Sequence, residues 1–402
     1  MGVWSLFFTV TTILETSKAG LVKNAVIKFL NSEEQSEHKK IRTASLIINI
    51  LFTLFVGGII LLFSDTLSIF WDVPPLATLL RYYLLSLIAL VPFSHFEYIQ
   101  QAYLSFSGIL TSYLVRQGIF FVAVISLSLR FDGYTLLYYL VFLQALSISI
   151  GSAIGYFYSK KFISQHLSYS KFWIIKLIEY GRYVLATNIS SLVFRSTDQI
   201  MVASFVSASA VALYNVCIRI TNLLDIPSTV AAEVLFPKSV KLINQDSSSG
   251  KYLYEKSVGI ILALLIPASI FIFIFPEYIL YVIAGPEYEE ASSILQITVL
   301  YGLFLPFLKQ FGTMMDATGH PNVNFRVILI LAVINIIANY LFIQEFGLLG
   351  AAYGTLLTYL IGYTISQFVL SNRLGVSPIR VVSEIMYSYK NIYDLLRSRT
   401  VK

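Results

Sequence analysis

Charged residues are scarce in this chain of 402 residues: only 12% are Asp, Glu, Lys or Arg, whereas 57% are hydrophobic. Soluble domains carry about a quarter charged residues. The apolar residues also come in repeated runs that are long enough to cross a membrane, which takes about 20 residues. A soluble enzyme or binding domain is therefore excluded, and the chain is predicted to be an all-α polytopic membrane protein.

Cysteine and histidine are also rare, at one and four residues. The single Cys217 allows no disulfide within the chain and is typical of a packing thiol. None of His38, His95, His166 and His320 has Cys or carboxylate neighbours at metal-ligand spacing. A phosphate-binding glycine loop and a nucleophile elbow are missing too. We therefore expect no metal, no cofactor and no enzyme activity; an ion gradient or substrate consumption would drive transport.

Basic residues gather in alternate loops, so the net charge of +6 indicates membrane topology and no nucleic-acid partner. Lys and Arg are frequent at 31–42, at 159–182, at 237–256 and after 371, and they are nearly missing from the loops between. Such loops face the cytoplasm in multi-pass proteins of the cell membrane. The C-terminus is therefore predicted to be cytoplasmic.

Apolar length predicts about eleven transmembrane segments. They lie near 2–30, 42–63, 76–105, 108–129, 133–158, 180–206, 210–236, 253–275, 290–315, 323–343 and 348–371. The expected organisation is a five-span lobe at 1–158, a cytoplasmic interfacial linker at 159–179, a six-span lobe at 180–372 and a cytoplasmic tail at 373–402. In the linker, aromatic residues alternate with lysines, which is typical of a helix at the membrane surface. Residues 378–402 show a similar but less clear pattern. An odd number of segments places Met1 outside.

A weak internal repeat predicts two pseudo-symmetric lobes around a central cavity. Glu15, preceded by Leu, matches Asp225, also preceded by Leu, and Lys28 matches Lys238 at the same offset of 210 residues. Repeats of this kind are typical of transporters.

Five ionisable residues stand well inside the apolar segments 180–206 and 210–236, namely Arg195, Asp198, Arg219, Asp225 and Glu233. Each unpaired charge there costs at least a few kcal/mol. Arg195 and Asp198 are three residues apart and share a helix face. They either line a polar cavity or neutralise each other while packing the lobes together. Arg219 either lines a cavity or snorkels, and Asp225 follows it. Pro227 predicts a bend in this second helix.

The first lobe and a later segment hold further charges. Glu15 and Lys18 lie three apart in the first segment. Arg116 either lines the cavity or bonds a backbone carbonyl within its lobe. Lys309 and Asp316 form either a gate pair or ordinary interfacial charges.

Several stretches resemble Wzx-type polysaccharide-unit flippases, in the superfamily of multidrug, oligosaccharidyl-lipid and polysaccharide exporters. The matching residues are 198–202, 207–215, 316–322, 335–340 and 346–352. Each stretch alone is weak, but their order and spacing together are fairly specific and extend the resemblance over nearly the whole chain. The family core has twelve helices with a cytoplasmic N-terminus. Residues 2–31 resemble its second helix, so the resemblance implies that the first helix is missing.

The resemblance implies a flippase for polyprenyl-pyrophosphate-linked oligosaccharides in surface polysaccharide biosynthesis, such as that of lipopolysaccharide O-antigen. The implied headgroup contacts are Arg116, Arg195, Arg219 and Lys18, and the implied cation- or proton-coupling residues are Asp198, Asp225 and Glu15. The implied partners are the lipid-linked oligosaccharide, membrane lipids, an H⁺ or Na⁺ gradient and other polysaccharide-assembly proteins.

Three alternatives stay open at this level. A multidrug exporter of the same superfamily would share the fold but would need a more apolar or anionic cavity for cationic drugs. A membrane polysaccharide polymerase or ligase would present a large external loop with catalytic groups, and the predicted external loops are short. An inactive fragment would follow from a missing helix.

Overall fold

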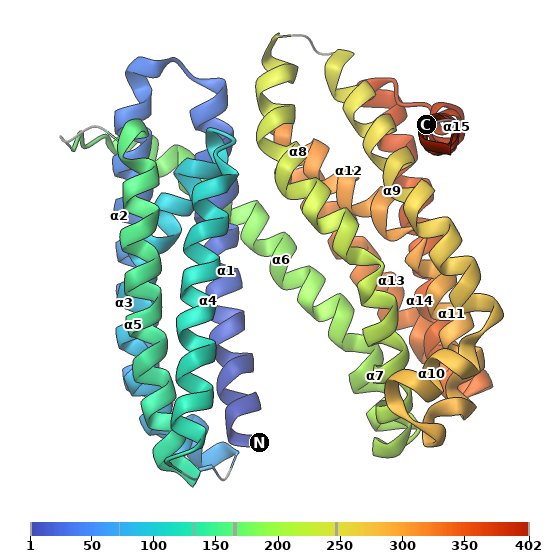
Figure 1. The fold of residues 1–402 in the computed structure, drawn as a ribbon, viewed down its shortest axis with the longest axis horizontal. Helices are drawn as coiled ribbons and strands as arrows, with labels where there is room; N and C mark the ends of the chain where they lie inside the picture. Colours follow the sequence, from blue (N-terminus) through green and yellow to red (C-terminus); the bar gives the residue numbers. More distant parts are fainter. Residues whose placement is uncertain (1, 72, 132, 164–166, 246–247, 401–402) are drawn as a thin grey trace. The chain divides into compact units, whose positions relative to one another are not determined.

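The computed structural model describes residues 2–71, 73–131, 133–163, 167–245 and 248–400, and over these residues all regular structure is helical (Figure 1). The chain divides into residues 1–185, here called unit 1, and residues 186–402, called unit 2. The boundary lies inside helix α6 (Lys171–Phe205), so one continuous helix contributes to both units.

Unit 1 contains five long helices and the first part of α6. The helices are α1 (Gly2–Ser32), α2 (Gln35–Phe70), α3 (Pro75–Ala102), α4 (Phe106–Ser128) and α5 (Gly133–Ser159), followed by the short 3₁₀ helix η1 (Lys160–Phe162). Helix α3 packs against α1, α2 and α5. Its residues Leu79, Leu80 and Tyr83 are buried together with Phe7 of α1 and Val141 of α5. Polar side chains on this buried face of α3 therefore enter the interior of unit 1.

Unit 2 contains the second part of α6 and the remaining helices. These are α7 (Ala208–Leu223), α8 (Asp225–Gln245), α9 (Ser248–Ile274), α10 (Pro276–Ala284), η2 (Pro286–Ala291), α11 (Ser292–Gly302), α12 (Leu305–Ala317), α13 (Pro321–Phe346), α14 (Leu348–Leu374) and α15 (Pro378–Thr400). Two buried apolar clusters hold it together. One centres on α7, α11 and α14, and the other on α9, α12 and α13.

Local sequence explains the breaks around α7. Ser207 ends α6 and begins α7, because its side-chain oxygen accepts a hydrogen bond from the backbone N–H of Ala210 at 3.1 Å. Helices α7 and α8 meet at Leu224 with a bend of 43°. Pro227 lies in the first turn of α8, where its missing N–H costs little. The predicted bend is confirmed, and it places Asp225 at the first position of α8.

A tight hairpin joins α13 to α14. Gly347 adopts φ +57°, a backbone conformation that favours glycine. Gly350 follows, and a Cβ atom there would lie 2.0 Å from the carbonyl oxygen of Phe342. The absence of a side chain therefore lets the two helices approach closely, which fixes the register of α14 against α13.

Eight described helices are long and apolar enough to cross a membrane, and the bent pair α7–α8 makes nine if it counts as one span. Each of these coincides with one of the eleven expected segments. The remaining two, 2–30 and 180–206, form the long helices α1 and α6 at the expected positions. Both carry charged side chains, and neither is among the helices that are apolar enough to cross a membrane. That α1 and α6 also span the membrane stays a prediction.

The expected linker contains several kinds of structure. Residues 164–166 lie outside the described residues, and 160–162 form η1. Helix α6 begins at Lys171 and continues without interruption through the next expected span. Two contacts join the start of α6 to other parts of unit 1. The Lys176 ammonium lies 2.9 Å from the Glu33 carboxylate, and the Trp173 indole N–H donates to the Glu37 carboxylate at 2.5 Å.

Candidate functional site

Asp198 lies in a buried polar cluster of unit 2, contributed by α6, α7, α13 and α14. Its carboxylate accepts hydrogen bonds from the hydroxyls of Tyr214 at 3.0 Å and Thr355 at 2.8 Å, and from the amide of Asn339 at 2.7 Å. Asn335 donates to the Thr355 hydroxyl at 3.2 Å. A buried carboxylate needs such donors because desolvation of the charge is costly. The cluster therefore holds Asp198 in a fixed position.

The Asp198 cluster also contains oxygen atoms without a partner. The side-chain carbonyl oxygens of Asn335 and Asn339 are buried and accept no hydrogen bond from the part of the chain that the structure describes. Buried polar atoms without a partner are uncommon and call for an explanation. Carboxylate and amide oxygens are the ligand types that bind a hard cation, and Asp198 alone can take up a proton.

Asp225 is the centre of a second cluster, contributed by α6, α8 and α12. The guanidinium of Arg195 lies 3.4 Å from the Asp225 carboxylate, and the ammonium of Lys309 lies 3.3 Å from it. The Thr229 hydroxyl donates to the same oxygen at 3.5 Å. Two cations share one carboxylate, so the cluster is positive overall. Because the Arg195 side chain is 55% exposed, its guanidinium is accessible to an anionic ligand.

These contacts correct two sequence-based interpretations. Arg195 pairs with Asp225 and not with Asp198, although Asp198 is one turn away on its own helix, because the hydroxyl and amide donors already surround Asp198. Lys309 does not pair with Asp316, which instead accepts a hydrogen bond from Asn324 at 3.3 Å.

An aromatic row, made of Phe194, Tyr301, Phe304, Phe307, Tyr359 and Tyr363, continues the Asp225 cluster. Phe194 precedes Arg195 and packs edge-on against Tyr359, with ring centres 5.5 Å apart. Phe307 stands two residues before Lys309 and packs edge-on against Tyr363 at 4.8 Å. Tyr359 also lies close enough to Arg195 and Asp225 to interact electrostatically with both, so this end of the row is near the Asp225 cluster.

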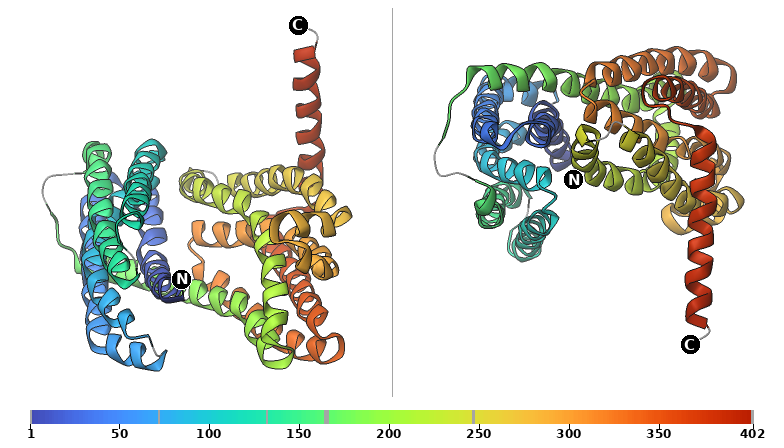
Figure 2. Two further views of the ribbon diagram at one scale, coloured as in Figure 1. Left: turned by 60° about the horizontal axis from the view of Figure 1, so that its bottom comes forward. Right: turned by 90° about the horizontal axis from the view of Figure 1, so that it is seen from above.

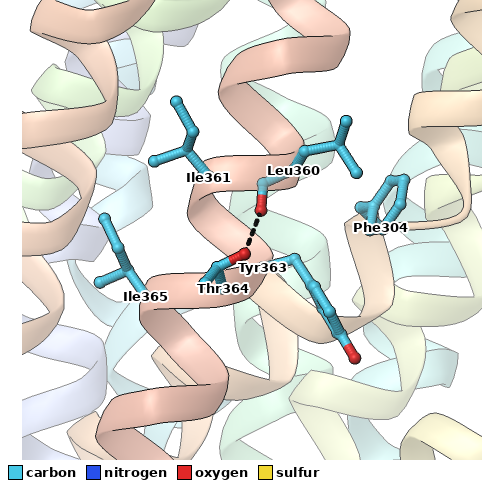
Figure 3. Close-up of a pocket in the computed structure, with 6 residues that line it drawn as sticks. All are labelled: Phe304, Leu360, Ile361, Tyr363, Thr364 and Ile365. Atoms are coloured by element: carbon cyan, nitrogen blue, oxygen red, sulfur yellow. Dashed lines mark hydrogen bonds between the residues drawn. The ribbon is translucent and has the colours of Figure 1, made fainter.

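The aromatic row borders an open hollow of about 440 Å³ in unit 2 (Figure 3). Phe304 lies on one side, and the residues from α14 are Leu360, Ile361, Tyr363, Thr364 and Ile365. The Thr364 hydroxyl donates to the Leu360 carbonyl at 2.9 Å, so the wall is mainly apolar. The arrangement suits an amphiphile with an anionic head and an apolar part.

Arg219 is exposed on α7 and makes no hydrogen bond or ion pair with the described residues. It remains separate from the Asp225 cluster, in which Arg195 and Lys309 are the cations.

Unit 1 contains its own polar cluster. Arg116 lies over the rings of Phe93 and Tyr113, 5.1 and 5.9 Å from their centres, which is a cation–π arrangement. The Tyr113 hydroxyl donates to Glu97 at 3.0 Å, and Lys23 lies 3.7 Å from the same carboxylate. Arg116 is therefore held by rings and half-buried among charges.

Glu15 and Lys18 have different surroundings within unit 1. Glu15 accepts a hydrogen bond from the Tyr83 hydroxyl at 2.8 Å. Lys18 is only 4% exposed, and its ammonium has no hydrogen-bond partner among the described residues. Lys18 is thus inside the packed helices rather than at a surface of unit 1.

The sequence model of a polysaccharide biosynthesis protein family matches residues 1–293. The chain belongs to this family. Two curated relatives of this chain come from Haloferax volcanii and Methanocaldococcus jannaschii. A probable low-salt glycan biosynthesis flippase of Haloferax volcanii is 25% identical over 205 residues, covering 50% of this chain and 43% of the relative. An uncharacterised membrane protein of Methanocaldococcus jannaschii is 30% identical over 216 residues, covering 53% and 43%.

The matched region spans less than half the length of these curated relatives. A third, a capsular polysaccharide biosynthesis protein of Staphylococcus aureus, is 33% identical over 151 residues, covering 34% of this chain and 33% of the relative.

Solved structures share the fold of this chain. An outward-facing multidrug resistance transporter of the multidrug and oligosaccharidyl-lipid exporter superfamily has a TM-score of 0.81 at 16% identity, covering 94% of this chain and 89% of that one. A transporter of the same superfamily from Pyrococcus furiosus has a TM-score of 0.78 at 15% identity, covering 92% and 87%. The predicted all-α, transporter-like membrane fold is confirmed.

Sequence reasoning found the charged residues of the two clusters but missed several of their polar partners. Thr355 was not singled out, and Asn335 and Asn339 were noticed only as part of a resemblance. Their spacing of four residues in the apolar helix α13 was a usable signal, because it places two amides on one face. The aromatic row left no such signal, since aromatic residues are common throughout the chain.

Proposed function

We propose that this protein is a flippase, which moves polyprenyl-pyrophosphate-linked oligosaccharide units across the cytoplasmic membrane by alternating access. Membership of the family and the names of its curated relatives support a role in glycan export. A pyrophosphate and its sugars cannot cross hydrocarbon unaided, because removing charge from water is costly. A protein that moves them must supply compensating charge within its helices.

The observation that carries this proposal is the accessible Arg195 guanidinium beside Lys309, with one carboxylate between them. Arg is suited to bind phosphate because its planar fork donates two parallel hydrogen bonds. The adjacent aromatic hollow offers an apolar surface for the lipid or the sugar faces. A site for cationic drugs would have the opposite charge, so the cluster favours an anionic substrate.

We further propose that Asp198 binds the coupling cation or proton. Its carboxylate and the partnerless oxygens of Asn335 and Asn339 support this assignment. Asp225 would then act as the counter-ion that the substrate displaces from Arg195, which differs from the coupling role expected from the sequence.

The other predicted charges enter the proposal in different ways. Arg219 is exposed and can meet a headgroup directly, whereas Arg116 would first have to leave its two aromatic rings. Lys18 is buried, and Glu15 is half-buried and bonded to the Tyr83 hydroxyl, so a role of Lys18 in substrate binding requires helix movement and a role of Glu15 in coupling requires exchange of its partner. The cytoplasmic C-terminus and the two-lobe boundaries remain part of the proposal.

The test is reconstitution in liposomes with a fluorescent lipid-linked oligosaccharide, whose arrival in the opposite leaflet is followed. The variant is Arg195→Gln, which leaves the Asp225–Lys309 pair in place. The matched control is Arg81→Gln, which removes a surface arginine paired with Asp65 in unit 1. Loss of a charge-assisted hydrogen bond predicts a rate about tenfold lower for Arg195→Gln, with Arg81→Gln unchanged.

Equal rates for the two variants would contradict the role of Arg195. Absence of lipid transfer by the unmodified chain, together with efflux of a cationic dye, would instead favour a multidrug exporter.

A further inference from the structure

The last helix of the chain, α15, lies crosswise to the spans of unit 2. In Figure 1, α15 is seen end-on, whereas α8, α9 and α13 are seen from the side. The right-hand view of Figure 2 is turned by 90°, and there α15 is seen from the side. The helix is not among those apolar enough to cross a membrane. Figure 2 also shows that much of α15 projects beyond the neighbouring helices of unit 2.

Two contacts with α9 fix the rotation of α15 about its axis. The backbone N–H of Ser377, just before the helix, donates to the Glu255 carboxylate at 2.8 Å. A Cβ atom on Gly259 would lie 2.5 Å from the Cβ of Glu384, so the two helices approach closely there. Val381 on the same side is buried. The remaining faces of α15 therefore point in determined directions.

An apolar stripe is left uncovered by this packing. Ile379, Val382 and Met386 follow one another by three and four residues, which places them on one helix face. They are 80%, 59% and 65% exposed. Isolated apolar residues at a surface are ordinary, but a stripe along one face of a helix is typical of one that lies on a bilayer.

The charge of α15 specifies the kind of lipid. The helix carries four basic and two acidic residues. Lys390 adjoins the apolar stripe on the helix surface, and Arg380 is exposed on the opposite face. The end of unit 2 where α8 ends and α9 begins is also basic, with Lys238, Lys241 and Lys251. Anionic headgroups attract basic residues near a membrane surface.

From these observations we propose that α15 is a membrane-surface helix, whose Ile379–Val382–Met386 stripe inserts among anionic phospholipids beside unit 2. Lys390, which adjoins the stripe, contacts the lipid phosphates. This inference is independent of what the protein transports.

The experiment places a fluorescent label at either of two positions of the full-length protein in lipid nanodiscs. Met386→Cys carries the label on the stripe, and the control Asn391→Cys carries it on the opposite, exposed face. The unmodified chain is the labelling blank, because its one cysteine, Cys217, is buried. Quenching is measured with lipids that carry a nitroxide near the head of the acyl chain, and separately with aqueous iodide.

The expected result is lipid quenching about twofold or more stronger at position 386 than at 391, with the opposite order for iodide. Replacing phosphatidylglycerol by phosphatidylcholine should weaken lipid quenching at 386, and so should Lys390→Gln. Equal quenching at both positions, or a label at 386 that neither quencher reaches, would overturn the proposal. Lipid quenching at position 386 that does not change when phosphatidylcholine replaces phosphatidylglycerol would overturn the proposed preference for anionic lipids.

Discussion

The carboxylate of Asp225 lies 3.4 Å from the guanidinium of Arg195, and it stands at the first position of α8, directly after the bend at Leu224. A negative charge is favourable at a helix N-terminus, because the first backbone N–H groups have no partner. The same carboxylate neutralises Lys309 on α12. Asp225 therefore connects the bend to two cations.

Replacing Asp225 by Asn leaves Arg195 and Lys309 close together without a counter-ion. We expect the variant to lose about 1 kcal/mol of stability, a small value because both cations are partly exposed. Thermal unfolding of the purified protein in detergent measures the change. The double variant Asp225→Asn/Lys309→Gln relieves the repulsion and should regain part of the loss. A double variant less stable than the single one would contradict this account.

The positions of the helices were largely predictable from the sequence, because an apolar run of about 20 residues has few other structures available in a membrane. The turn at Ser207 and the bend near Pro227 followed from residues with strong local preferences. Such features depend on neighbours in the chain alone.

The contacts of the site were not predictable in the same way. Spacing shows that Arg195 and Asp198 share a helix face, but it does not tell which helix lies opposite each of them. Asp198 meets Thr355, 157 residues later, and Arg195 meets Asp225 across the bend. These partners depend on how α7, α8, α13 and α14 pack, which a single sequence does not reveal.

Binding of a cation at the Asp198 cluster predicts that the coupling ion stabilises the folded protein, because a ligand that binds only the native state raises its stability. We expect the melting temperature of the unmodified chain to rise when sodium replaces choline, or when the pH falls if the proton is the coupling ion. Asp198→Asn, which keeps the shape but removes the charge, should abolish the rise.

Asp316→Asn is the matched control, because Asp316 is also buried in unit 2 and accepts a hydrogen bond from an asparagine. It should keep the response to the cation. A melting temperature of the unmodified chain that responds to neither cation nor pH would refute the coupling role of Asp198.

Lys176 holds the start of α6 against unit 1. Its ammonium lies 2.9 Å from Glu33, 4.5 Å from the Trp173 ring centre and 4.9 Å from the Phe29 ring centre. Lys176→Gln removes the ion pair and the cation–π contacts together, so we expect a loss of about 1 kcal/mol. Lys171→Gln, an exposed lysine at the start of the same helix, should change the unfolding midpoint little. An equal effect of both variants would assign the loss to net charge.

Gly350→Ala tests the close approach of α13 and α14. The new Cβ atom would lie 2.0 Å from the carbonyl oxygen of Phe342 and 2.3 Å from its carbon, and these backbone atoms cannot move without shifting α13. We expect a loss of about 3 kcal/mol of stability. The shift would also disturb the contact of Thr355 with Asp198, since Thr355 lies little more than one turn beyond Gly350.

Gly118→Ala is the matched control within a helix of unit 1. A Cβ atom there meets nothing within 4 Å, so the substitution adds only the helix preference of alanine. We expect it to stabilise the protein by about 0.5–1 kcal/mol. Opposite signs for the same chemical change would show that contact with the Phe342 backbone, and not the loss of glycine, determines the outcome at position 350. A neutral Gly350→Ala would refute the close approach of the two helices.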